Sequence, residues 1–417
     1  MRSPRFLTRA LLLAALAAAL CAACLLPSRA AAARRRDEAG RLLDELGLEG
    51  EAAQVLMVGV SGSRALSAES RALLGSMPLG AVLLFGRNVP DEPAGLGALT
   101  AELQAAAAGA ALGIPLIVAL DHEGGSVFRF RGEGITRLPP PLEVGARGPR
   151  YARALGEAAG RELKALGVNM NLAPVVELLD ERNESFLGDR SYGREAARVD
   201  AAAGAFIEGL QARGTAAVAK HFPGNESSDP HRGAALLDVD REGYERGYRP
   251  RFEAAARAGV AAVMASHAIV PALDPERPAT LSRPALAGEL RGRIGFRGLI
   301  LTDDLYMKAI SAGSPPELAA VEALAAGADL LMLSSGSGAH PVRAAIVRAV
   351  EEGRLPRSRL RDAARRVLEL KLRFGMAQAL DPRTRAEALA AYPGLVEEDA
   401  RAVAAALSAS RGEGRSR

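Results

Sequence analysis

The sequence predicts an α/β fold in which eight parallel strands close into a TIM-type (β/α)8 barrel that forms a single domain. Eight short runs are continuously apolar and rich in Val, Ile, Leu and Met, as strands buried on both faces are. Ala/Leu/Arg/Glu-rich stretches with helical spacing separate them. The predicted strands begin near Val55, Ala81, Pro115, Met170, Ala216, Ala262, Leu299 and Leu330. An open doubly wound sheet is the alternative architecture.

Ahead of the barrel, the first residues resemble a secretory signal. Arg2, Arg5 and Arg9 precede an apolar run over 10–26, which is the order of a positive n-region and an h-region. Cys24 ends a loose bacterial lipobox and would be lipidated if that signal is used. Cleavage near Ala30 or an uncleaved anchor are the alternatives. The Arg34 to Arg36 cluster could contact anionic lipid, although a solvated linker is the favoured interpretation.

The remaining elements follow in order along the chain. Helices are predicted over 152–166, 196–212, 243–258 and 316–326, and the widest gap between strands holds a loop with three consecutive prolines. An amphipathic helix over 360–374 closes the pattern. The predicted domains are a signal and basic linker over 1–36, the barrel over 37–378, and a helical extension with a polar tail over 379–417.

Composition excludes several classes of protein. The chain has 417 residues, 49% hydrophobic and 24% charged, as expected for a globular enzyme rather than a disordered chain. Its net charge of +4 does not indicate nucleic-acid binding, because three of those charges lie in the predicted signal. Both cysteines lie in that segment too, so no disulfide is expected in the barrel. Nucleotide, metal and serine-hydrolase motifs are missing, and we expect no cofactor and no metal.

Ionisable residues gather where the predicted strands end, which is where parallel barrels carry their binding residues. Asp121 ends the third strand and is followed by a glycine pair and Arg129, a combination suited to a polyhydroxylated ligand. A structural ion pair between Asp121 and Arg129 is the alternative. Arg190, after the fourth strand, could donate to hydroxyls or to an acetamido group, or lie on the surface.

The fifth strand ends in Lys220 and His221, and the loop behind it carries Asp229, Pro230 and His231. At the barrel rim both strand residues can turn inward. Pro230 keeps Asp229 extended, so its carboxylate can reach the imidazole of His231 and raise its basicity. His231 could then donate a proton to a leaving oxygen and later accept one from water.

The seventh strand delivers Asp303 and Asp304 to the rim. Adjacent residues of an extended strand face opposite ways, so one carboxylate could be a nucleophile while the other makes hydrogen bonds or caps the next helix. Capping by both is the alternative. His267 lies near the end of the sixth strand.

In combination, these motifs resemble the family-3 glycoside hydrolases, specifically their single-barrel β-N-acetylhexosaminidase branch. The likeness runs from about Val55 to Met376. Its motifs are Leu84-Phe85-Gly86-Arg87-Asn88, Asp121-His122-Glu123-Gly124-Gly125, Asn171-Leu172-Ala173-Pro174-Val175, Lys220-His221-Phe222-Pro223-Gly224, Ser266-His267, Pro271-Ala272-Leu273-Asp274 and Thr302-Asp303-Asp304.

The resemblance implies a role for each matching residue. Asp303 matches the catalytic nucleophile, His231 the acid/base and Asp229 its partner. Residues matching those that bind the terminal sugar are Asp121, Arg129, Arg190, Lys220 and His221, and we assign His267 to this group. The loop from His221 to His231 is two residues shorter than the family pattern. Asn225, Pro230, Ser126 and Phe128 stand where that pattern has His, Ser, Arg and Gln.

The resemblance implies a retaining exo-β-N-acetylglucosaminidase that hydrolyses terminal N-acetylglucosamine from peptidoglycan fragments or chitooligosaccharides through a glycosyl-enzyme intermediate. The absence of Trp and 4% aromatic content disfavour a long stacking platform along a polymer. We expect an exported monomer, periplasmic or at the cell surface, with possible membrane attachment through lipidated Cys24. A β-glucosidase or β-xylosidase of the same fold, or a silent wall-binding lipoprotein, is the alternative. Water or phosphate could be the acceptor.

Overall fold

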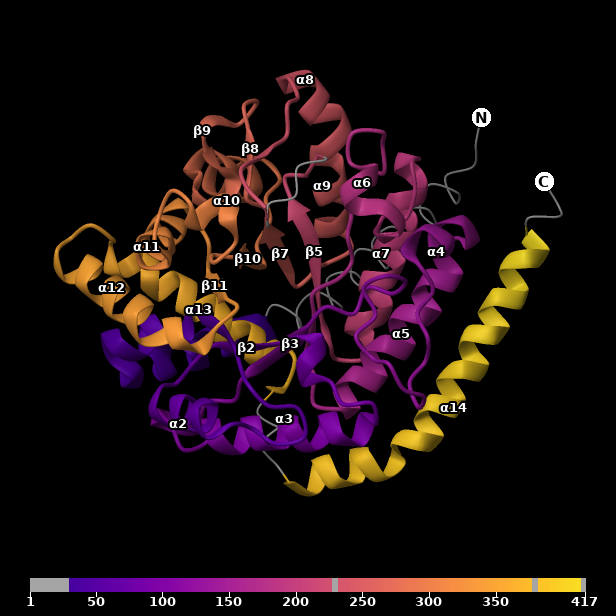
Figure 1. The fold of residues 1–417 in the computed structure, drawn as a ribbon, viewed down its shortest axis with the longest axis horizontal. Helices are drawn as coiled ribbons and strands as arrows, with labels where there is room; N and C mark the ends of the chain where they lie inside the picture. The colour runs from indigo at the N-terminus through magenta and orange to yellow at the C-terminus, as the bar shows by residue number, and fades with distance from the viewer. Residues whose placement is uncertain (1–29, 227–231, 377–381, 414–417) are drawn as a thin grey trace, which may run out of the picture.

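The computed structural model of the chain describes residues 30–226, 232–376 and 382–413, and a closed barrel of parallel strands forms its centre. Each strand begins within two residues of its predicted start, so the TIM-type prediction is confirmed and the doubly wound alternative is wrong. The order around the barrel is β1 (Leu56–Gly59), β2 (Ala81–Leu84), β3 (Ile117–Leu120), β4 (Met170–Asn171), β5 (Ala216–Phe222), β7 (Ala262–Ala265), β10 (Leu299–Asp304) and β11 (Leu330–Leu333) (Figure 1).

The strands are apolar throughout because both of their faces are buried. In β3, Ile117 and Ala119 belong to the cluster inside the barrel, whereas Val118 and Leu120 pack between the strands and the helices. This alternation fills the interior with side chains and leaves no pore. Polar residues are therefore tolerated only where a strand ends.

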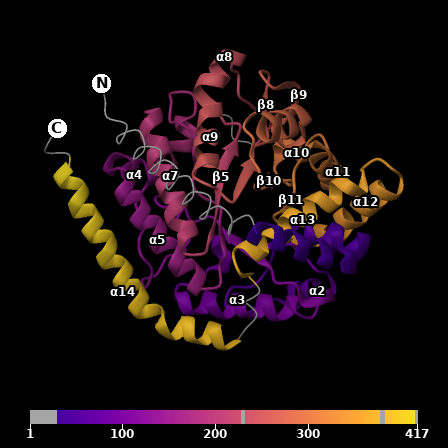
Figure 2. The ribbon, with the colours of Figure 1, turned by 180° about the vertical axis from the view of Figure 1, so that it is seen from behind.

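A ring of helices covers the outside of the barrel (Figures 1 and 2). They are α2 (Ala68–Ser76), α3 (Pro93–Ala107), α5 (Pro149–Ala165), α7 (Ala196–Ala212), α9 (Arg249–Arg257), α11 (Pro316–Ala326) and α12 (Ala339–Glu351).

The helices predicted over 152–166, 196–212 and 316–326 coincide with α5, α7 and α11. The helix predicted over 243–258 is divided into α8 (Arg241–Gly243), a π-helical turn (Tyr244–Tyr248) and α9. Pro250 in the first turn of α9 has no N–H to donate back to the preceding turn, which accounts for this interruption.

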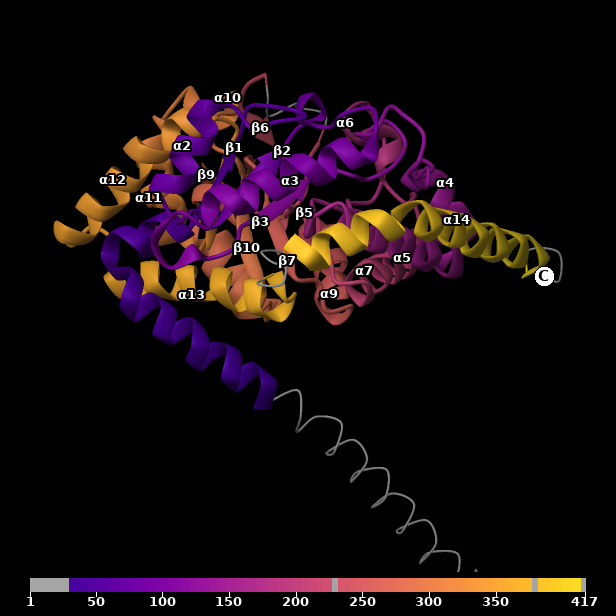
Figure 3. The same cartoon turned by 90° about the horizontal axis from the view of Figure 1, so that it is seen from below.

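The two ends of the barrel differ in what covers them. At the end where the strands finish, called here the upper face, the loops hold α4 (Pro141–Arg147), α6 (Glu184–Leu187) and α10 (Lys308–Ser311). A small sheet in the order β6 (Ala235–Leu236), β8 (Ala268–Val270) and β9 (Asp274–Pro278) also lies there. Figure 3 shows α6, β6 and α10 on one side and α13 on the other.

At the opposite end, called here the basal face, α13 (Arg357–Arg373) closes the barrel, where the amphipathic helix over 360–374 was predicted. Val367 and Leu370 join the interior cluster. Lys371 is also buried there, and its ammonium donates to Gln54 Oε1 at 2.8 Å and to the Leu79 carbonyl at 3.4 Å. Burial lowers the pKa of Lys371 to about 7.

Two further helices lie outside the barrel. Residues 30–54 are helical, so the predicted boundary at residue 36 lies inside one continuous helix. α14 (Pro382–Glu413) occupies the predicted C-terminal extension and packs along α5, where Arg161 pairs with Asp399 at 2.9 Å (Figure 2). The predicted signal up to residue 29, Cys24 included, lies outside the described residues. Within the described ranges, no helix has both the length and the hydrophobicity to cross a bilayer.

Lys371 gives a first prediction. Because its folded pKa is about 7 and its unfolded pKa about 10.4, the unfolded chain binds more protons between these values, and stability rises with pH there. Replacing it (Lys371→Met) removes up to about 1.4 kcal/mol per pH unit of that slope. Urea unfolding from pH 7 to 10 measures it, with exposed Lys308→Met as the control. An unchanged slope in Lys371→Met would contradict the burial argument.

Candidate active site

A cavity of about 390 Å³ opens at the upper face of the barrel. Its lining includes seven of the residues that the sequence singled out, which are Asp121, Arg129, Arg190, Lys220, His221, Asp303 and Asp304. They come from the ends of β3, β5 and β10 and from the turn over 188–190. The fold therefore brings together, at the ends of the strands, residues that are far apart in the chain.

An ionic cluster forms one wall of the cavity. The Lys220 ammonium donates to Asp121 Oδ1 at 2.7 Å and lies 2.6 Å from Glu123 Oε1. Arg190 grips Glu123 with both Nε and Nη2, at 2.9 and 3.0 Å. Arg129 Nη2 donates to Asp121 Oδ2 at 3.3 Å. The alternative ion pair between Asp121 and Arg129 is therefore present, as part of this cluster.

The cluster keeps its carboxylates ionised. Burial alone would raise the pKa of Asp121, but Lys220 and Arg129 outweigh it and hold the pKa at about 2. For Glu123, burial is again outweighed, here by Lys220 and Arg190, and its pKa is also about 2. Burial would lower the pKa of Lys220, whereas Asp121 and Glu123 raise it above the ordinary value. These groups therefore keep fixed charges at neutral pH.

Glu177 holds the beginning of the loop behind β5. Its carboxylate accepts from the His221 backbone N–H at 3.0 Å and lies 2.8 Å from His221 Nδ1. It also accepts from the Asn225 backbone N–H at 2.6 Å, while the Asn225 amide lies at 3.3 Å. The pairing of β5 with β7 is irregular between Ala219 and Phe222, and Lys220 and His221 both line the cavity. The predicted Asp229 and His231 lie outside the described residues.

Asp303 and Asp304 differ in their hydrogen bonds. Asp304 Oδ1 accepts from the backbone N–H groups of Tyr306 and Ser334, at 3.2 and 2.9 Å. Asp303 Oδ1 accepts from the Asp304 N–H at 2.8 Å, and no hydrogen bond from the described part of the chain reaches its Oδ2. Oδ2 of Asp304 also receives no hydrogen bond from the described residues, and both side chains line the cavity, so the two carboxylates differ at Oδ1, where Asp304 has two backbone donors and Asp303 has one.

His267 is not among the described residues that line the cavity. It is buried, with Nδ1 2.9 Å from Thr280 Oγ1 and Nε2 2.9 Å from the Asp304 carbonyl oxygen. These contacts fit a role for His267 in supporting the end of β10, because both ring nitrogens already have protein partners. The substrate contact assigned to His267 stays a prediction.

Sequence reasoning assigned no role to Glu123 and Glu177. Glu123 had a usable signal, because it is two residues after Asp121 and follows the same strand end. The sequence offered no such signal for Glu177, since it lies in the irregular segment after β4 and reaches His221 only through the fold.

Three of the residues that depart from the family pattern make local contacts. Ser126 Oγ donates to Asp189 Oδ1 at 2.6 Å. The Phe128 ring lies 4.7 Å from the buried His122 ring, and Asn225 binds Glu177. Pro230 lies outside the described residues. No group of three or more His, Cys, Asp or Glu side chains in the described ranges is placed to hold a metal ion.

The barrel and its strand-end cavity of charged and polar groups define a class of barrel enzymes that act on small hydroxylated ligands. Comparison with known proteins is more specific. The family model described as the glycosyl hydrolase family 3 N terminal domain matches residues 47–370. The chain belongs to this family of glycoside hydrolases.

Similar proteins and solved structures agree with this family assignment. A β-hexosaminidase of Nitrosomonas eutropha is 37% identical over 67% of this chain and 80% of its own, and one of Thioalkalivibrio sulfidiphilus is 39% identical over 68% and 80%. A family-3 β-N-acetylglucosaminidase structure from Paenibacillus sp. matches with a TM-score of 0.75 at 34% identity, over 83% of this chain and 68% of that one. The β-N-acetylhexosaminidase of Beutenbergia cavernae gives 0.70 at 32%, over 78% and 98%. The predicted kinship with the β-N-acetylhexosaminidase branch is confirmed.

Glu123 gives the second prediction. In Glu123→Gln the carboxylate that neutralises Lys220 and Arg190 is lost, which leaves buried positive charge and costs about 3 kcal/mol of stability. The exposed pair of Glu143 with Arg147 supplies the control, and Glu143→Gln costs at most about 0.5 kcal/mol. Urea unfolding at pH 7 compares the two. Equal losses would mean that the cluster does not hold the strand ends together.

Proposed function

We propose that this chain is a retaining exo-β-N-acetylglucosaminidase that removes terminal β-linked N-acetylglucosamine from peptidoglycan-derived fragments. The observation that carries the proposal is that Asp303, whose carboxylate accepts one hydrogen bond from the described residues, lines the same small cavity as the ionic cluster. The names of the relatives, β-hexosaminidases and β-N-acetylglucosaminidases, support the aminosugar.

In the first chemical step, Asp303 attacks the anomeric carbon while the bond from that carbon to the leaving oxygen breaks. His231, paired with Asp229, gives its proton to that oxygen, so the fragment leaves as a neutral alcohol. The product of this step is a glycosyl ester on Asp303. Water then attacks the same carbon from the vacated side and gives a proton to His231, while the bond from that carbon to Asp303 breaks and releases the free carboxylate. Two inversions restore the original configuration.

The ionic cluster grips the sugar during both steps. Carboxylate oxygens of Asp121 accept from sugar hydroxyls, while Lys220 and Arg190 donate to ring substituents. Because these side chains already bind one another at 2.6 to 3.3 Å, they need little reordering when substrate arrives. A cavity of about 390 Å³ suits one terminal sugar better than a polymer, which supports exo action.

The substrate and the nucleophile can be tested together. We expect the purified chain to hydrolyse an aryl β-N-acetylglucosaminide in preference to the matching glucoside and xyloside. Asp303→Asn should lower kcat by roughly three orders of magnitude or more, because the attacking oxygen is lost. The neighbouring Asp304→Asn, which keeps an oxygen for its backbone partners, should lose about tenfold.

Three results of that assay would count against the proposal. A preference for the glucoside or xyloside would favour the alternative glycosidases. Binding of N-acetylglucosamine without turnover of any aryl glycoside would favour the silent wall-binding protein. A larger loss in Asp304→Asn than in Asp303→Asn would assign the nucleophile to the other carboxylate.

The role of His231 can be tested through the leaving group. Against a β-linked disaccharide, whose leaving oxygen needs a proton, His231→Ala should lower kcat by about 10²- to 10⁴-fold. Formation of the glycosyl ester from a dinitrophenyl glycoside needs no such proton, so the burst of released phenol should survive. Rapid-mixing kinetics measures both, with exposed His340→Ala as the control. Loss of the burst as well would show that His231 is not the acid.

We further propose that the protein is exported and anchored by a lipid on Cys24. The arginines and apolar run before this residue support the proposal. In a bacterial host that processes lipoproteins, Cys24→Ser should move the protein from the membrane to the soluble extracytoplasmic fraction, and Cys21→Ser should not. Fractionation followed by mass spectrometry of the N-terminus checks this. Equal distribution of both variants would contradict acylation at Cys24.

A further inference from the structure

The basal face of the barrel carries an excess of positive charge on α13 and on the segments that enter the strands. The segments that enter its strands after a helix contain exposed Arg297 and exposed Arg213, of which Arg213 pairs with Glu157 at 2.6 Å. These segments are 77–80, 108–116, 166–169, 213–215, 258–261, 294–298 and 327–329. Asp329 is the one carboxylate in these segments. It is fully buried and pairs with arginines, among them Arg359 at 2.8 Å and Arg366 at 3.0 Å.

The two helices at this face differ in charge, because the helix over 30–54 has six carboxylates and four arginines, whereas α13 is basic. α13 has seven arginine or lysine residues and two carboxylates. The helix over 30–54 begins with Arg34, Arg35 and Arg36, of which Arg36 lies 3.5 Å from Glu369. Arg34 and Arg35 have no carboxylate partner within the described ranges. Burial, and then the nearby charge of Arg35, lower the pKa of Arg373, so like charges meet here without a counterion.

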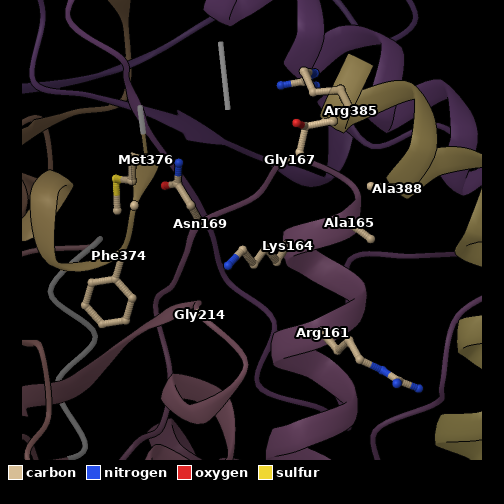
Figure 4. A pocket seen from close by; sticks show the side chains of 12 residues that line it. Arg161, Lys164, Ala165, Gly167, Asn169, Gly214, Phe374, Met376, Arg385 and Ala388 are labelled. Atoms are coloured by element: carbon tan, nitrogen blue, oxygen red, sulfur yellow. The ribbon is translucent and has the colours of Figure 1, made fainter. Parts of the chain in front are cut away.

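A second cavity, of about 260 Å³, lies beside this face between α5, α14 and the end of α13. Figure 4 shows the Lys164 side chain extending toward Phe374 and Met376. Lys164 is exposed and has no carboxylate partner in the part of the chain that the structure describes. A cation next to an apolar wall is the combination that suits the boundary between headgroups and acyl chains.

The N-terminal part of the chain leads to the same face. The helix over 30–54 packs on α13, with Arg361 reaching Asp44 and Glu51, and its first residues project away from α10 and β6 (Figure 3). The sequence before it is an apolar run over 10–26 preceded by three arginines. The segment with the strongest affinity for a bilayer therefore joins the protein at its basic end.

We propose that the basal face docks on an anionic lipid bilayer, so that the cavity with Asp303 opens away from the membrane. Charge complementarity and the position of the helix over 30–54 select this partner. The interpretation of Arg34 to Arg36 as a solvated linker is replaced by a contact with the headgroups. The proposal does not depend on the reaction at Asp303, nor on whether Cys24 is acylated.

Orientation can be measured directly, because the chain has no tryptophan. Two exposed leucines provide a matched pair: Leu112, 44% exposed in the basal segment before β3, and Leu236, 43% exposed in β6 on the upper face. Full-length Leu112→Trp and Leu236→Trp are mixed with vesicles containing phosphatidylglycerol and brominated phosphatidylcholine. We expect quenching in Leu112→Trp alone. Equal quenching, quenching only in Leu236→Trp, or none in either would overturn the proposal.

The charge contribution is measured with a second pair of variants. Binding of the full chain to vesicles of phosphatidylcholine with phosphatidylglycerol, relative to phosphatidylcholine alone, removes the shared contribution of the apolar run. Arg35→Ser/Arg297→Ser should weaken this ratio by tenfold or more, since each charge near an anionic surface contributes about fivefold. Arg131→Ser/Arg283→Ser removes two exposed arginines from upper-face loops and should leave it unchanged. Equal effects of the two double variants, or no preference of the full chain for phosphatidylglycerol, would overturn the proposal. Aryl-glycoside turnover is the control and should stay constant in all variants.

Discussion

The buried ion cluster formed by Asp121, Glu123, Arg190 and Lys220 is the interaction on which the rest of the active site depends. Removing a charge from water costs several kcal/mol unless a partner compensates it, so these side chains are stable at this depth only together. Lys220 is 2% exposed and lies within 2.7 Å of two carboxylates. The closed barrel makes this possible, because it fixes the ends of β3 and β5 near each other. This wall of the cavity, which binds the sugar in the proposed function, is therefore a product of the fold.

Asp303 and Asp304 show how one strand end supplies two functions. Two backbone N–H groups and the contact of His267 with the Asp304 carbonyl fix the second residue. The first lines the cavity and accepts one hydrogen bond from the described chain, from the Asp304 backbone N–H. A nucleophile needs this combination, since a carboxylate held by several donors is stabilised in its ground state and attacks less readily.

The sequence predicted the fold well for a physical reason. Strands buried on both faces must be apolar at every position, so all eight were visible as runs from Leu56 to Leu333. The interruption before α9 and the continuous helix across residue 36 were not predicted, because one proline and the packing on α13 decide them. In the site, the positions of Asp121, Lys220 and Asp303 at strand ends made them candidates, and the family resemblance supplied their expected roles. Glu177 could not be found, because only folding brings it to His221, and the placement of His267 depends on contacts with Thr280 and the Asp304 backbone.

The account is tested most directly by trapping the covalent intermediate. A fluorinated N-acetylglucosaminyl fluoride forms the glycosyl ester quickly and hydrolyses it slowly, so the label can be mapped and its structure determined. We expect the sugar on Asp303 Oδ2, with its hydroxyls bonded to Asp121 and Lys220 and the 227–231 loop on the opposite side of the ring. A label on another residue, or a sugar bound away from the ion cluster, would contradict the account.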